Sequence, residues 1–106
     1  MNVRWHIPAN QEWAILFDAL GGAEVAGFAM KATFGWDDTG VGSNSSEFTA
    51  LPGGRMIWSG DFQFEGESGW WWTQSTMNIT ISESSDQVFN SNNGAGMSIR
   101  CIQDSA

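Results

Sequence analysis

Carboxylate, amide and hydroxyl side chains crowd one short stretch of the sequence, residues 37–47. It contains Asp37, Asp38, Asn44 and Glu47, separated mainly by Gly, Ser and Thr. Calcium takes about six to eight oxygen ligands, several of them carboxylates, but this stretch does not have the spacing of an EF-hand loop. We therefore predict a solvated loop without a metal, with a calcium site as the alternative, and Asp37, Asp38 and Asn44 are candidate ligand-binding residues.

Tryptophan is the second residue type with binding chemistry, because an exposed indole ring can stack on the apolar face of a sugar. Trp70, Trp71 and Trp72 are consecutive, so in a strand Trp71 points to one face and the other two point to the opposite face. At least one face must meet the core, which makes most of this motif structural. Trp36 and Trp58 adjoin loops and, with Trp70, are the candidate rings for ligand contact. For each of these rings burial in the core is the favoured interpretation, and ligand contact is the alternative.

The residues most often used in catalysis are scarce. His6 is the only histidine and Cys101 the only cysteine, and no motif pairs either one with a nucleophile or a base. A zinc site needs several Cys and His ligands. We therefore predict no enzymatic activity, no cofactor and no metal. We expect His6 to be packed and hydrogen-bonded, and Cys101 to be a buried thiol without a disulfide partner.

Charge and length limit the possible partners. The 106 residues carry a net charge of −8 with only four Lys and Arg, whereas nucleic-acid binders neutralise phosphates with clustered cations. No apolar run approaches the roughly 20 residues of a membrane-spanning helix, and no signal peptide opens the sequence. We therefore predict a single domain, residues 1–106, that binds no nucleic acid and does not insert into a membrane.

Apolar residues with helical spacing predict a helix over residues 10–21 and a weaker one over residues 25–32. Asn10 is the expected N-cap of the first helix. Gly27 weakens the second helix unless another segment packs closely against it. The apolar face of the first helix is Trp13, Leu16, Phe17 and Leu20, and that of the second is Val25, Phe28, Ala29 and Ala32.

Short apolar segments separated by Gly, Ser and Asn turns predict strands in the second half of the chain. Met77, Ile79 and Ile81 alternate with polar residues, as in a half-buried strand. The expected strands are residues 48–51, 55–58, 69–74, 77–81, 87–89 and 97–102. Two helices followed by a compact, mostly antiparallel sheet with long loops define an α+β fold.

Several ordered motifs resemble one family. Trp5-His6-Ile7-Pro8, Phe48-Thr49-Ala50-Leu51-Pro52-Gly53-Gly54 and Gly96-Met97-Ser98-Ile99-Arg100-Cys101 are similar to motifs of the Fibrobacter succinogenes major paralogous domain family. The resemblance implies the C-type lectin-like fold in a surface or secreted module that has no established common activity. The family's Thr before the first helix is Ala9 here, so we expect the capping box with Glu12 to be lost.

The resemblance and the loop composition together favour a non-catalytic recognition module. It would bind a glycan or a protein through residues 37–46 and 58–69. The alternative is a structural or assembly subunit of a surface filament or a virion, which would make the chain a homo-oligomer. The resemblance also implies an extracellular or cell-surface location, as part of a longer or separately exported product.

Overall fold

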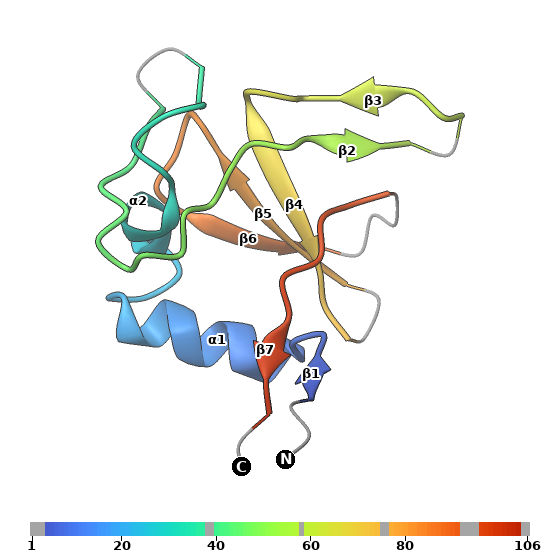
Figure 1. Cartoon of the computed structure of the whole chain (residues 1–106). Coiled ribbons are helices and arrows are strands. Elements are labelled where there is room, and N and C mark those ends of the chain that lie inside the picture. The colour runs from blue at the N-terminus through green and yellow to red at the C-terminus, as the bar shows by residue number, and fades with distance from the viewer. Residues whose placement is uncertain (1–3, 38–39, 58, 75–76, 92–95, 105–106) are drawn as a thin grey trace.

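The computed structural model describes residues 4–37, 40–57, 59–74, 77–91 and 96–104. They form an α+β fold with two helices and small antiparallel sheets (Figure 1). In chain order the elements are β1 (Trp5–His6), α1 (Asn10–Ala19), α2 (Ala26–Met30), β2 (Arg55–Met56), β3 (Phe62–Gln63), β4 (Ser68–Trp72), β5 (Asn78–Ser82), β6 (Val88–Ser91) and β7 (Ile102–Gln103). Among these residues, neither helix has the length and apolar character needed to cross a bilayer.

The antiparallel meander β4–β5–β6 is the largest sheet and supplies one wall of the core. Trp71 pairs with Ile79, and Ile81 pairs with Val88, so these four side chains share one face of the sheet. All four are buried, which confirms the apolar face predicted for β5, but the polar residue Asn78 of the same strand is also buried. The Trp71 ring lies over Gly69, where an added Cβ would be 2.5 Å from the ring. Only glycine leaves room for the ring at that position.

Helix α1 presents the predicted apolar face to the core. Trp13 and Phe17 are buried, and Leu16 and Leu20 pack against them. The N-cap lies one residue earlier than expected, because Ala9 rather than Asn10 precedes the first turn of the helix. Half of the capping box survives, contrary to the expectation that it is lost, since the Glu12 carboxylate accepts the Ala9 backbone N–H at 3.0 Å.

Helix α2 buries a different face from the predicted one. Val25 and Phe28 are 51% and 47% exposed, whereas Ala26, Gly27 and Met30 are buried. The cause is a close approach of the turn between β5 and β6. The Gly27 N–H donates to the Asp86 carbonyl at 2.7 Å, and an added Cβ would lie 2.5 Å from that oxygen. From the sequence we expect a segment to pack closely against Gly27, and the β5–β6 turn at Asp86 is that segment.

In the described ranges, three small sheets stand where the sequence predicts a single compact sheet. β1 pairs with β7 and β2 with β3, both antiparallel, and isolated bridges such as Trp71–Ser98 connect the pieces. In the predicted strand 48–51 the structure has one bridge, Lys31–Ala50, and residues 97–101 have the single bridge of Ser98. Neither β1 nor β3, each of two residues, is among the strands predicted from the sequence.

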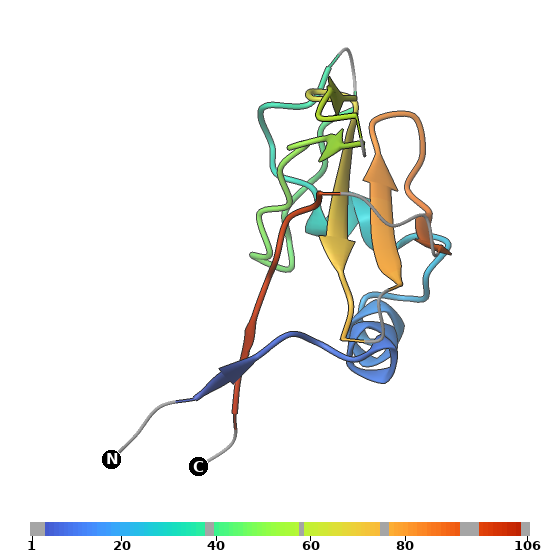
Figure 2. The same ribbon diagram turned by 90° about the vertical axis from the view of Figure 1, so that its right-hand side faces the viewer.

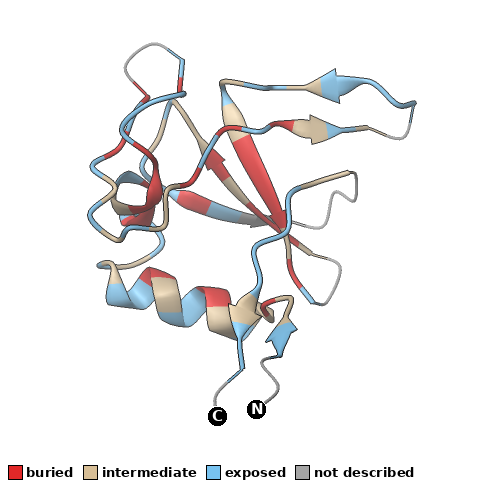
Figure 3. Ribbon diagram, in the orientation of Figure 1, coloured by how far each residue is buried: buried red, intermediate tan, exposed pale blue. Residues whose placement is uncertain are grey.

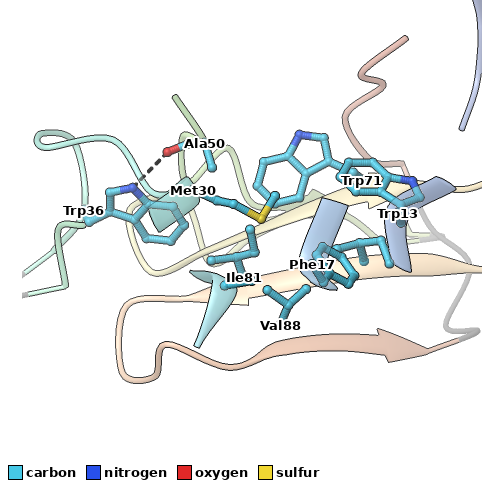
Figure 4. Packing of buried hydrophobic residues seen from close by; sticks show 10 residues of the cluster. Trp13, Phe17, Met30, Trp36, Ala50, Trp71, Ile81 and Val88 are labelled. Carbon is cyan, nitrogen blue, oxygen red and sulfur yellow. Dashed lines mark hydrogen bonds between the residues drawn. The ribbon is translucent and has the colours of Figure 1, made fainter. Parts of the chain in front are cut away.

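The core lies between the helices and the meander, with exposed residues around it (Figure 3). Met30 and Ile81 occupy its middle, while Trp36 and Trp13 lie toward its two ends (Figure 4). Phe48 contacts both Trp13 and Trp71, with ring centroids 5.9 and 6.1 Å apart. Pairs of rings in this range contribute about 0.5–1.5 kcal/mol beyond their burial.

Candidate functional site

The two candidate ligand-binding rings that the structure describes are both buried, which agrees with the interpretation of each as a core residue. Trp36 is 5% exposed, and its indole N–H donates to the Ala50 carbonyl at 3.0 Å (Figure 4). Trp70 is 9% exposed. Neither ring presents a free face for a sugar. Trp58, a further candidate, lies outside the described residues.

The polar residues of the loop 37–47 that the structure describes contact different parts of the protein and do not converge on one site. The Asp37 side chain is exposed, and its backbone N–H donates to the Gly66 carbonyl at 2.8 Å. Asn44 is bound instead to Thr49, accepting the Thr49 N–H at 2.7 Å and donating to its hydroxyl at 2.9 Å. Asp38 lies outside the described residues. Across the described ranges, no three His, Cys, Asp or Glu side chains are grouped so that they could hold a metal ion.

His6 links the two ends of the fold through two carboxylates. Its Nδ1 lies 2.5 Å from Asp104 Oδ1, and its Nε2 lies 2.8 Å from Glu12 Oε2. Hydrogen bonds to Asp104 and then to Glu12 raise the pKa of His6 above its ordinary value. The Ala9 N–H and then His6 lower the pKa of Glu12. The expectation of a hydrogen-bonded histidine is confirmed, and we name these three side chains the His6 clasp.

Cys101 is exposed, so the expectation of a buried thiol is wrong. The predicted strand through residues 97–102 is regular only from Ile102 onward, and the alternation that would have turned Cys101 inward is absent. The thiol instead lines a pocket of about 300 Å³ beside α1.

This Arg100 pocket, as we name it, has an apolar wall and one charged rim. Trp13, Leu16, Phe48 and Ile102 form much of the wall, and Glu12 and Arg100 are its charged side chains. The Arg100 guanidinium lies 4.2 Å from the centroid of the Phe48 ring. Such stacking fixes the cation over the aromatic face. The sequence does not predict this pocket, because α1 and residues 100–102 are far apart in the sequence and lie side by side only in the folded protein.

A second hollow of about 310 Å³ lies beside the β2–β3 hairpin, and we name it the hairpin groove. Met56 and Phe62 are cross-strand partners, so both side chains lie on the same side of the hairpin. Phe62 is 78% exposed and Met56 is 39% exposed. Met97 and Ser98 complete the opposite wall of the groove. The alternation Phe62-Gln63-Phe64 after a Ser-Gly turn is a signal that could have marked this hairpin from the sequence.

Arg55 fixes the hairpin to the meander. Its guanidinium lies 5.0 Å from the Trp70 ring centroid and 5.7 Å from that of Phe64. Phe64 has φ of +67°, a left-handed conformation that is strained for a bulky residue. This turn of the backbone brings the Phe64 ring to 5.5 Å from Trp70. The hairpin therefore projects from this cluster of side chains at the end of the molecule opposite β1 and β7 (Figures 1 and 2).

These features define a small α+β domain that displays a hairpin and long loops away from its paired first and last strands. The Fibrobacter succinogenes major domain (Fib_succ_major) is a family model that matches residues 3–103. The chain therefore belongs to this family, as its ordered motifs predict. No curated protein and no solved structure is similar enough to the chain to count as a match.

Proposed function

We propose that this domain is a non-catalytic recognition module with a C-type lectin-like fold, and that its ligand is a segment of another protein. The observation that carries the proposal is Phe62, a large apolar side chain that is 78% exposed beside a groove. Phe62 lies beside its cross-strand partner Met56, which is 39% exposed, and contiguous exposed apolar side chains mark interaction sites. The family resemblance supports the lectin-like fold, a location at the cell surface or outside the cell, and a role in binding.

The residue types of the hairpin groove favour a protein over a glycan. Phe, Met and Arg are enriched at protein interfaces, and Phe62, Met56 and Arg55 line this groove. β3 pairs only with β2 within the described part of the chain, so its outer edge offers backbone groups to an added strand. By contrast, the two described Trp rings that were candidates for sugar stacking are buried.

The test is selection of binding peptides from a random peptide display library on the purified domain. We expect selected peptides to bind Phe62→Ser about tenfold or more weakly, since a central interface residue contributes at least that much. Ile15→Ser is the matched control, because Ile15 is also highly exposed but lies on α1. Its affinity should stay within about twofold of the wild type.

Three outcomes would overturn the proposal. One is a set of peptides that bind both variants equally. A second is a glycan array that gives ligands whose binding needs Phe62, which would make the module a lectin. The third is wild-type chain that forms multimers with rising concentration while Phe62→Ser does not, which would favour the assembly subunit and make the groove a contact between copies.

A further inference from the structure

The Arg100 pocket is separate from the hairpin groove and has its own chemistry. The two hollows share no lining residue. The pocket volume, about 300 Å³, is at the lower end of the range for small-molecule sites. Trp13, Leu16 and Phe48 give it the apolar wall on which the hydrocarbon part of a ligand would be desolvated.

Arg100 supplies a positive charge that no carboxylate of the described residues neutralises, because the ion pairs found there involve only His6 and Lys31 as cations. Its guanidinium is held over the Phe48 ring at the rim. A guanidinium fixed in this way presents parallel N–H donors, which match the two oxygens of a carboxylate.

Glu12 is the acidic side chain of the pocket, and its carboxylate already accepts hydrogen bonds from other groups of the protein. It accepts hydrogen bonds from His6 at 2.8 and 2.9 Å and from the Ala9 N–H at 3.0 Å. Arg100 is therefore the charged group of the pocket that has no carboxylate partner among the described residues.

We propose that the Arg100 pocket binds a small apolar carboxylate. The hydrocarbon part lies against Trp13, Leu16 and Phe48, and the carboxylate accepts hydrogen bonds from the Arg100 guanidinium. A small apolar carboxylate matches both the apolar wall and the Arg100 guanidinium, which has no carboxylate partner among the described residues. The site is independent of the peptide-binding role of the hairpin groove.

Cys101 provides the readout, because it lines the pocket, is exposed and is the only cysteine. The probe is hydrocinnamate, and its uncharged analogue hydrocinnamamide is the ligand control. We expect saturating hydrocinnamate to slow alkylation of Cys101 by neutral iodoacetamide severalfold. Titration calorimetry should give an affinity for hydrocinnamamide that is about tenfold or more weaker, the factor typical of a hydrogen bond to a charged group.

Arg100→Gln should weaken hydrocinnamate binding by about the same factor. Arg4→Gln changes the net charge equally and is the matched variant, because Arg4 is exposed and does not line the pocket. Its affinity should equal that of the wild type. Unchanged alkylation at saturating hydrocinnamate would overturn the proposal. Equal binding of the acid and the amide, or equal loss in Arg100→Gln and Arg4→Gln, would also overturn it, since Arg100 would then not select the carboxylate.

Discussion

The ammonium group of Lys31 lies 5.6 Å from the centroid of the Trp36 ring, inside the protein. Lys31 is 2% exposed, and its Nζ donates to the carbonyls of Ser82 and Ser85 at 3.2 and 3.1 Å. Asp86 Oδ1 lies 3.8 Å away. Lys31 thus joins the start of the long segment between α2 and β2 to the turn between β5 and β6.

Lys31 is the only lysine of the chain, so its reactivity can be measured alone. Burial lowers its pKa, but the ammonium group is enclosed, and we expect it to resist acetylation by a succinimidyl ester until the protein unfolds. Mass spectrometry after brief labelling should find the modification at the N-terminal amine and not at Lys31. Rapid acetylation of Lys31 in folded protein would show that the segment opens.

Lys31→Met should lower the free energy of unfolding by about 1–3 kcal/mol, because the carbonyls of Ser82 and Ser85 lose their donor while the volume is kept. Urea unfolding at neutral pH measures the loss. Since the pKa of Lys31 is lowered in the fold, the wild type should gain stability relative to Lys31→Met as the pH rises toward 10.5. A constant difference would contradict the lowered pKa.

The His6 clasp should stabilise the fold only within a window of pH. The raised pKa of His6 means that its contribution is complete below 6.5 and is lost as the pH rises through the higher folded value. The lowered pKa of Glu12 means that its contribution is complete above 4.5 and is lost below that. His6→Gln should therefore cost more stability at about pH 5.5 than at about pH 9. If His6→Gln lowers the urea midpoint equally at both pH values, the His6 clasp does not make the predicted pH-dependent contribution to stability.

Trp71→Ala should lower the free energy of unfolding by about 3–5 kcal/mol, because it empties space between Phe48, α1 and the meander. Phe89→Ala is the control on the same sheet, since Phe89 is 45% exposed. Its cost should stay below about 1 kcal/mol. Calorimetric melting measures the stability of both variants. A similar loss of stability in the two would show that Trp71 is not a core residue.

Gly27→Ala should destabilise the protein by about 1–3 kcal/mol, although alanine is the better helix former by about 1 kcal/mol. The added methyl group would meet the Asp86 carbonyl. Gly53→Ala is the matched control, because its Cβ would be 3.6 Å from the nearest side chain, Ser98. It should change the stability by less than about 0.5 kcal/mol. A neutral Gly27→Ala would mean that the β5–β6 turn moves aside easily.

The sequence predicts those parts of the fold that local periodicity determines. The face of α1 follows from the spacing of Trp13 and Phe17, and the buried side of β5 follows from the alternation of Ile79 and Ile81. The face of α2 is not predictable in this way. It depends on the approach of Asp86, far along the chain, to Gly27.

The candidate site is predicted less well, because burial of a loop residue depends on long-range contacts. Trp36 adjoins a polar loop in the sequence, yet the Ala50 carbonyl and Lys31 hold it inside the protein. Cys101 lies on the surface because the pairing of Ser98 with Trp71 does not continue into a strand. The exposure of Phe62 follows from the position of β3 at a sheet edge, which the sequence does not specify.

The pairing of β1 with β7 also has a mechanical consequence. Trp5 is opposite Gln103, so the polypeptide enters and leaves the domain side by side (Figure 2). A force that separates these two strands from that side would break their few hydrogen bonds one after another, starting at the periphery. The His6–Asp104 contact would rupture early in that process. The core around Trp13 and Trp71 would bear tension only after β1 and β7 had separated.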